Sequence, residues 1–538
     1  MGNFINCKME DTYIRCNIDM GNAGVDVFAS DISFANSTNF SGRVILPRAN
    51  LPRSLNAYFT NCTKLNAPIY VPNSYNTVSL SNCLAFNSLV TFEENAPRRN
   101  YSYMFYNCTN YNRPTTFGDV TNDYCLYSNT FENCTNFNQP VIIGNGATQL
   151  DYTFVNCIRF NQELYFPESV TRMVGVFMGC TNFNSLIHIP NNVTTCGLLI
   201  RNCTNYNRPI TVPDSVRGMM DFIGCLSFNS SVIIGNGVTG CNRLFDNTSI
   251  RQSNFNAPVT IGQNVQDCTN MFRGQVKFNQ PIVIPDATIK CNHMFLNCLS
   301  LNSLVTLGNN VTNTYGMFCG CTSFNRPVTF PGTADCKFTF SGCTALNSRV
   351  TISNGVNDCS GMFQECSSFN QPVVIPSSVN ACASMFLGCR SLNSPVTIGS
   401  GVKYAHQMFL YCNNFNQPVT IPSGIKNCST MFGYCSNFNQ PVVIPNGATD
   451  LWHMFLYCNN FSQDLYIPDS VTDSPMVLAG CENYHSTISV PFGGIGYAGI
   501  GSATAGTLGA KIIDRLNGIT YTASYNELNN SYYWDGLE

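Results

Sequence analysis

The sequence predicts a β-rich solenoid, a single-file array of about twenty coils of ~23 residues each. A Phe-Asn dipeptide or a close variant recurs at this period through most of the chain, and a short segment of alternating residues follows each copy. Cysteines stand at fixed offsets from the dipeptide. Because each repeat packs on its neighbours, the 538 residues need not divide into several globular domains.

The asparagine of the dipeptide locates each repeat. Its spacing is 23 residues for most of the chain and 21 to 27 where it varies, with degenerate outer members at Ser41, Ser462 and His485. The regular members are Asn66, Asn87, Asn112, Asn138, Asn161, Asn184, Asn207, Asn229, Asn256, Asn279, Asn302, Asn325, Asn347, Asn370, Asn393, Asn416 and Asn439.

A short strand is predicted directly after each marker. In the coil of Asn370, Val373 and Ile375 alternate with Val374, which is typical of a strand with one buried face. We expect Val373 and Ile375 to point inward, and Pro376 to end the pairing. One strand per coil predicts one long parallel sheet, in an array of the leucine-rich-repeat type.

The residues of this unit match a known repeat pattern, I-P-x-x-V-x-x-I-x-x-x-A-F-x-x-C-x-x-L-x-x-I-x-I-P. The matching positions run from Ile375-Pro376 through Val379, Phe386, Cys389 and Leu392 to Val396 and Ile398. The chain therefore resembles the BspA-like leucine-rich repeats of bacterial and protozoan surface proteins, from about Phe40 to Pro491. The Phe-Asn-Gln wording is also similar to repeats of Mycoplasma-type surface lipoproteins. The resemblance implies an adhesin or interaction scaffold without shared catalytic residues.

Both ends differ from the repeats. We expect residues 1–39 to form an N-terminal cap or attachment segment, 40–491 the solenoid, and 492–511 a Gly/Ala-rich connector. Residues 512–538 are predicted to form a small C-terminal α/β cap or attachment segment. LGAKIIDRLNG at Leu508–Gly518, which begins in the connector, suggests a short helix closed by glycine, and the following ITYTASYNE suggests a strand.

The composition excludes several function classes. Only 11% of residues are charged and the formal charge is −3, so no cationic field exists to neutralise nucleic acid. Met1–Asp11 lacks the pattern of a secretion signal, and Pro475–Ala510 is too weakly apolar to predict membrane insertion. Polarity comes from Asn, Ser, Thr and Gln, which suit contact with neutral polymers such as glycans.

The 29 cysteines form columns. Seventeen occupy one repeat position, including Cys62, Cys203 and Cys481, and eight more lie seven residues earlier. An odd total and an uninterrupted column predict buried, reduced thiols and folding in a reducing cytoplasm. The five histidines lie in different coils and no C-x₂-C pair occurs, so we expect no metal and no cofactor. Without a catalytic constellation, we expect no enzyme.

Candidate binding residues interrupt an outward row of threonines and valines on the predicted sheet. This row reflects sheet propensity, but Tyr70, Tyr165, His188 and Tyr466 break it, and exposed aromatic rings stack on sugars or anchor protein partners. Trp452 lies in the C-terminal coils among several tyrosines, which either bind a partner or pack against the terminal segment. The remaining candidates are Tyr533 and Trp534.

These observations favour a non-catalytic protein that recognises a host or cell surface. The leading hypothesis is a bacteriophage tail fibre or spike, made in the host cytoplasm and located in the virion. Its partners would be a host-surface glycan or protein receptor and other virion proteins, with homo-oligomers as a further option. The alternatives are a cell-surface leucine-rich-repeat adhesin and an intracellular interaction scaffold. A polysaccharide depolymerase would need paired acids, whereas Glu163 and Asp464 are many coils apart.

Overall fold

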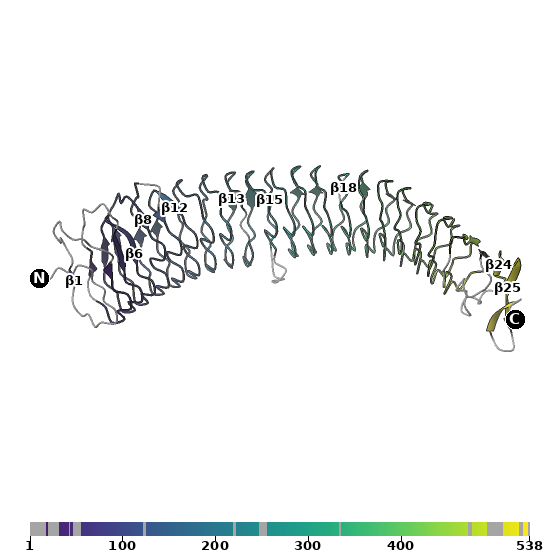
Figure 1. Cartoon of the computed structure of the whole chain (residues 1–538), viewed down its shortest axis with the longest axis horizontal. Helices are drawn as coiled ribbons and strands as arrows, with labels where there is room; N and C mark the ends of the chain where they lie inside the picture. The colour runs from purple at the N-terminus through teal and green to yellow at the C-terminus, as the bar shows by residue number, and fades with distance from the viewer. Residues whose placement is uncertain are drawn as a thin grey trace. The chain divides into compact units, whose positions relative to one another are not determined.

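The computed structural model describes residues 18–19, 32–41, 44–46, 55–121, 125–218, 222–246, 255–332, 335–471, 476–491, 509–526 and 531–535. The chain forms two compact units, Met1–Val265 and Gln266–Glu538. Within each unit the chain winds as a parallel β-solenoid, with about 18 turns in all (Figure 1). The predicted fold class is confirmed. In the described ranges the chain forms no helix, hence none long and apolar enough to cross a membrane.

The first unit carries the predicted strand ladder. Neighbouring strands pair in parallel one coil apart, as Ile69 pairs with Val90 and Tyr70 with Thr91. The ladder consists of β1 (Ile18–Asp19), β3 (Val44–Ile45), β5 (Ile69–Val71) and β7 (Val90–Phe92), then β9 (Thr115–Thr116) with β11 (Val141–Ile142), and finally β13 (Ile210–Val212), β14 (Val232–Ile234) and β15 (Val259–Thr260).

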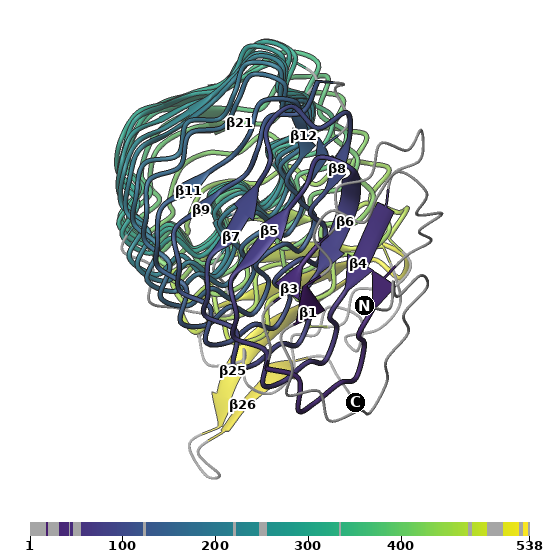
Figure 2. The ribbon, with the colours of Figure 1, turned by 90° about the vertical axis from the view of Figure 1, so that its left-hand side faces the viewer.

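A second ladder in this unit was not predicted from the sequence. Its six parallel strands are β2 (Ile32–Ser33), β4 (Leu55–Tyr58), β6 (Tyr75–Ser79), β8 (Arg99–Asn100), β10 (Cys125–Leu126) and β12 (Ala147–Gln149). Figure 2 shows the two ladders on different sides of the coil. The parallel pairing already includes Ile18–Asp19 and Ile32–Ser33, within the segment predicted as a cap.

The second unit continues the repeat with very short strands. They are β16 (Ile282–Val283), β17 (Val305–Thr306), β18 (Val328–Phe330), β19 (Val350–Ile352), β20 (Val373–Val374) and β21 (Val396–Thr397), which pair two by two. The expected single long sheet is therefore wrong in detail. Proline often stands at both ends of the strand, as Pro372 and Pro376 do, and leaves too few N–H groups for continuous pairing.

The C-terminal end of the second unit is a five-stranded sheet of β22 (Leu465–Tyr466), β23 (Thr487–Val490), β24 (Lys511–Asp514), β25 (Ile519–Asn526) and β26 (Ser531–Asp535). The predicted helix at Leu508–Gly518 is wrong, because β24 pairs in parallel with β23 and antiparallel to β25. Ile512 and Asp514 are buried in alternation, and Gly518, with φ 68°, belongs to a tight turn instead of a helix end. The predicted strand ITYTASYNE is confirmed as β25. Most of the predicted connector, residues 492–508, lies outside the described residues.

The core of each unit is a ladder of stacked aromatic rings. In the second unit Phe363, Phe386 and Phe409 follow one another at centroid separations of 5.5 and 5.6 Å with nearly parallel planes. Val373 and Ile375 are buried beside them, as the alternation predicts, and Val374 is exposed. The apolar residues of each coil thus meet identical positions in the next coil, which is how a narrow coil obtains a core.

Candidate functional site

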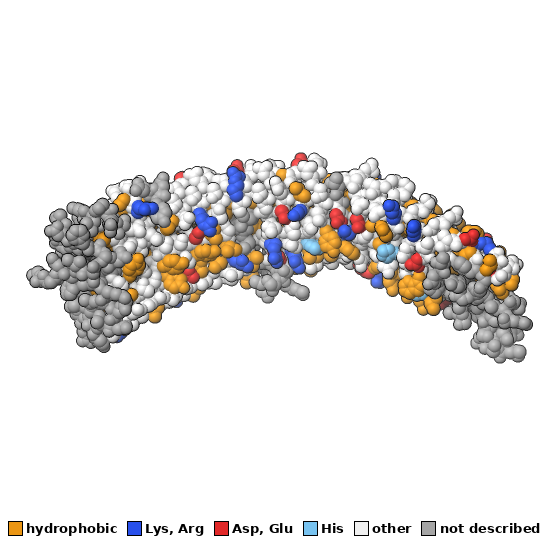
Figure 3. Space-filling view, viewed as in Figure 1, with side chains coloured by type: hydrophobic (Ala, Val, Ile, Leu, Met, Phe, Trp, Pro, Cys, Tyr) orange, Lys and Arg blue, Asp and Glu red, His pale blue; other side chains and the backbone are white. Residues whose placement is uncertain are grey.

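The outward row of the strand ladder is confirmed in both units. Strands β5, β7, β13 and β14 in the first unit and β18 and β19 in the second are buried, exposed and buried in turn. Charged side chains are few and scattered on the face shown in Figure 3, where uncharged side chains and backbone cover most of the surface and hydrophobic side chains form small groups. Such a surface has little long-range electrostatic attraction, so recognition depends on local contacts of individual residues.

The structure brings two of the predicted binding residues of the first unit together. Tyr165 and His188 occupy the same row position in adjacent coils, with ring centroids 6.4 Å apart and planes inclined by 6°. Tyr165 is 72% exposed, compared with 37% for Tyr70. Tyr70 pairs instead with Thr91, so it does not belong to this cluster.

Tyr466, in the second unit, is an internal contact. The guanidinium of Arg515 lies over its ring, 4.0 Å from the centroid. Arg515 Nη2 donates to the carbonyl oxygen of Ile467 at 2.7 Å and to Asp469 Oδ1 at 2.6 Å, and Nη1 donates to the carbonyl oxygen of Ser489 at 2.9 Å. The ring therefore helps to hold the end of β24 on the last coils, and the guanidinium occupies one of its faces.

Trp452 is exposed in the second unit and stacks on His453 at 4.1 Å. The C-terminal coils also carry a stack that sequence reasoning did not resolve. Tyr411, Tyr434 and Tyr457 follow one another at centroid separations of 4.5 and 5.0 Å. All three adopt the left-handed backbone region, with φ between 54° and 64°.

Tyrosine in this conformation is uncommon and costs on the order of 1 kcal/mol. The same repeat position is glycine or asparagine in most other described coils, so its occupancy was a usable signal. Stacking of the rings offsets part of the cost, since an aromatic pair contributes roughly 0.5–1.5 kcal/mol. The predicted residues Tyr533 and Trp534 lie in β26, but their side chains are outside the described part of the structure.

The marker asparagines serve the architecture. The N–H of Asn393 donates to Asn370 Oδ1 at 2.8 Å, and the N–H of Asn416 donates to Asn393 Oδ1 at 2.9 Å. The residue after the marker also reaches back, as Ser394 Oγ donates to the carbonyl oxygen of Asn370 at 2.8 Å. An amide ladder along the repeats thus engages the Oδ1 atoms of these side chains in contacts between coils.

The thiol column also has a structural role. All seventeen thiols are buried and donate to a main-chain carbonyl of the preceding coil, as Cys389 Sγ does to Phe363 O at 3.0 Å. Burial raises the pKa of the Cys108 and Cys481 thiols to about 12. Protonated, enclosed thiols are poor nucleophiles and poor metal ligands. Across the described ranges no group of three or more His, Cys, Asp or Glu side chains is placed to hold a metal ion.

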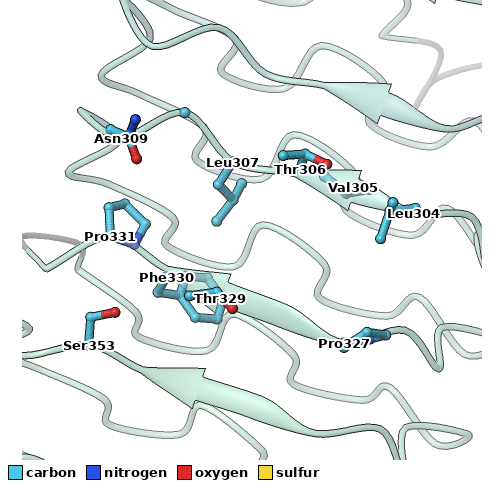
Figure 4. Close-up of a pocket in the computed structure, with 11 residues that line it drawn as sticks. Leu304, Val305, Thr306, Leu307, Asn309, Pro327, Thr329, Phe330, Pro331 and Ser353 are labelled. Carbon is cyan, nitrogen blue, oxygen red and sulfur yellow. The ribbon is translucent and has the colours of Figure 1, made fainter.

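A cavity of about 380 Å³ opens where β17 and β18 part in the second unit (Figure 4). Leu307, Phe330 and Pro331 supply apolar walls, while Asn309 and Ser353 supply polar groups. The eleven lining residues include no titratable side chain. The cavity can therefore hold a small neutral group through apolar contacts and hydrogen bonds to Asn309 and Ser353.

Two family models match the sequence. The one described as Mycoplasma protein of unknown function, DUF285, matches residues 31–144, 239–351, 334–445, 377–467 and 399–490, more than half of the chain. The one described as BspA type leucine rich repeat region matches residues 102–221 and 150–271. No curated protein matches the sequence.

Two solved structures are similar to the chain. A leucine-rich repeat protein from Bacteroides ovatus is 16% identical, with 77% of this chain and 92% of that chain covered and a TM-score of 0.49. A leucine rich cell surface protein from Faecalibacterium prausnitzii is 14% identical, with 70% and 83% covered and a TM-score of 0.24.

Proposed function

We propose a function for this chain, which belongs to the family described as Mycoplasma protein of unknown function, DUF285. It is a non-catalytic protein that binds a host or cell surface. The Tyr165–His188 pair carries this proposal. The two rings stand side by side on a solvated sheet face where most coils have threonine or valine. Exposed aromatic rings supply large contact area with little loss of side-chain freedom, which makes them effective anchors for sugars and proteins.

A binding experiment tests the anchor. Fluorescently labelled full-length protein is applied to a glycan array and to whole cells, together with the Tyr165→Ala and His188→Ala variants. We expect each variant to lose at least tenfold in apparent affinity, since truncating an anchor costs roughly 2 kcal/mol or more. Thr211→Ala, in the same row and unit, is the matched control and should bind like the parent protein. Equal binding by all four proteins would contradict the proposed anchor.

The finer proposal is a bacteriophage tail fibre or spike located in the virion. The columns of buried thiols support it, because they suit folding in a reducing cytoplasm without export. The match to BspA-type repeats favours the alternative, an adhesin on a cell surface. Immunogold labelling separates these locations: label on virion tails supports the first, whereas label on a cell envelope in phage-free cultures supports the second. Cytosolic label alone would favour an intracellular scaffold.

A further inference from the structure

The residues that receive the Arg515 guanidinium belong to a short sequence that occurs a second time, in similar form, elsewhere in the chain. The segment QDLYIPDSVT at residues 463–472, which receives Arg515, echoes QELYFPESVT at residues 162–171. Tyr165 corresponds to Tyr466, Phe166 to Ile467 and Glu168 to Asp469. Each segment lies wholly within one unit, so the comparison is between two local structures.

The two segments have the same local fold. Leu164 and Leu465 are both 2% exposed and pair in parallel with an isoleucine of the next coil. The following turns are also alike, since the N–H of Val170 donates to Pro167 O and the N–H of Val471 to Pro468 O, each at 3.1 Å. The tyrosine ring, the next carbonyl and the acid therefore occupy equivalent places on the coil.

The carbonyl oxygen of Ile467, which binds Arg515, and the equivalent carbonyl oxygen of Phe166 both lack a main-chain donor in the next coil for the same reason. One coil later, the N–H that would reach this carbonyl belongs to the residue after the paired one, which is Pro491 for Ile467 and Pro190 for Phe166. Proline has no N–H, so it cannot donate to the preceding carbonyl. At Ile467 the guanidinium supplies the missing donor, at 2.7 Å.

At the other site the Tyr165 ring and Glu168 are exposed. Tyr165 is 72% exposed, compared with 53% for Tyr466 beneath its guanidinium. Glu168 Oε2 accepts the N–H of Asn191 at 3.1 Å, and a carboxylate has capacity for further donors through its second oxygen. Two arginines of nearby coils are engaged elsewhere, Arg172 with Asp151 and Arg208 with the carbonyl oxygen of Asn184.

We propose that Tyr165, the carbonyl of Phe166 and Glu168 form a receptor for an arginine side chain of a partner polypeptide. The internal example defines the chemistry: a planar guanidinium lies on the ring and donates to the Ile467 carbonyl and the Asp469 carboxylate. It also donates to the carbonyl and hydroxyl oxygens of Ser489, a position that His188 occupies beside Tyr165 and where the main-chain carbonyl alone is shared. It also shows how the arginine is held: Arg515 directly follows the short strand β24, so we expect the arginine of the partner to follow a short extended segment. The proposal rests on the proposed function and names the ligand of the same surface.

Titration of the full-length protein with L-argininamide, followed by NMR of ¹³C-labelled tyrosine rings, tests this receptor. We expect saturable binding and an affinity for L-lysinamide at least about fivefold weaker, since an ammonium lacks the planar fork. Tyr165→Ala and Glu168→Gln should each weaken argininamide binding about fivefold or more. Tyr70→Ala is the matched control, because Tyr70 is in the same row but has Asn73 in place of the acid. Binding that ignores Tyr165→Ala, or no saturable binding, would overturn the proposal.

A second variant uses the occupied site. Arg515→Ala should uncover the receiving groups at Tyr466, so the number of argininamide sites should rise from one to two. If the Arg515→Ala variant binds argininamide at the same single site as the parent protein, the shared motif is not sufficient for binding. That result would overturn the equivalence of the Tyr165 and Tyr466 sites. The test separates this proposal from the proposed function. Argininamide binding without surface binding would contradict the proposed function alone. Tyr165-dependent surface binding without argininamide binding would contradict the arginine receptor alone.

Discussion

Alanine at position 370 removes a central link of the asparagine ladder. Asn370 Oδ1 accepts the N–H of Asn393 at 2.8 Å and lies 3.0 Å from Ser394 Oγ, which also donates to the Asn370 carbonyl. The substitution leaves the hydroxyl its second acceptor but leaves the N–H without a protein partner. A net hydrogen bond of this kind contributes about 0.5–1.5 kcal/mol, and water can reach this edge of the coil. We therefore expect Asn370→Ala to lower the free energy of unfolding by about 1 kcal/mol.

Two measurements check this value. Urea unfolding gives the global change, and amide hydrogen exchange at Asn393 reports the lost bond directly, because its protection should fall about fivefold for a cost of ~1 kcal/mol. Asn370→Asp keeps an acceptor oxygen and should retain most of the protection. Asn310→Ala, at an exposed turn asparagine outside the ladder, should change neither quantity. Unaltered protection at Asn393 in Asn370→Ala would refute the role assigned to the ladder.

Further predictions concern close backbone contacts and buried thiols. Gly399→Ala should destabilise by roughly 1–3 kcal/mol in urea unfolding, because its Cβ would lie 2.5 Å from the Pro376 carbonyl, which cannot move aside. Gly388→Ala should cost less, about 1 kcal/mol from its φ of 75°, since the crowding atoms belong to the flexible Glu365 side chain; equal costs would contradict this argument. Burial raises the pKa of thiols such as Cys196 from 9.0 to about 12, so stability should be complete below pH 9 and fall between pH 9 and 12 as the unfolded thiols ionise first. Each such thiol lowers the free energy of unfolding by up to about 1.4 kcal/mol per pH unit in this range. A urea midpoint that stays constant from pH 7 to 10.5 under reducing conditions would contradict this prediction.

The repeat, the inward residues and the thiol column could be predicted because each depends on one coil and its identical neighbours. Val373 and Ile375 follow from alternation, and Cys389 from its place in a column, without knowledge of distant contacts. The second ladder could not be predicted in this way. Its strands include polar residues such as Asn100 and Gln149, whose main-chain pairing is imposed by coil stacking and not by an alternating pattern.

The candidate sites were harder to predict because their meaning depends on partners distant in sequence. Tyr466 and Tyr165 look alike in the sequence, yet only Tyr466 is covered, by an arginine 49 positions later that follows a strand mistaken for a helix. A four-residue strand such as Lys511–Asp514 is too short for periodicity to separate it from a helical turn. The left-handed conformation of Tyr411, Tyr434 and Tyr457 can be predicted only by comparing the same repeat position in many coils, where glycine and asparagine predominate. A single tyrosine gives no indication of its backbone conformation.

The hydrogen bonds of the marker asparagines and of the thiol column have a direction. Asn393 donates to Asn370, Ser394 to Asn370 and Cys389 to Phe363, so each donor finds its acceptor in the coil nearer the N-terminus. A ribosome releases the N-terminal coil first. Each new coil therefore meets the amide oxygens and carbonyls that accept these bonds already in place on the coil made before it. Synthesis can build the array one coil at a time, and a growing chain need not keep its apolar coils exposed until the last residue is made.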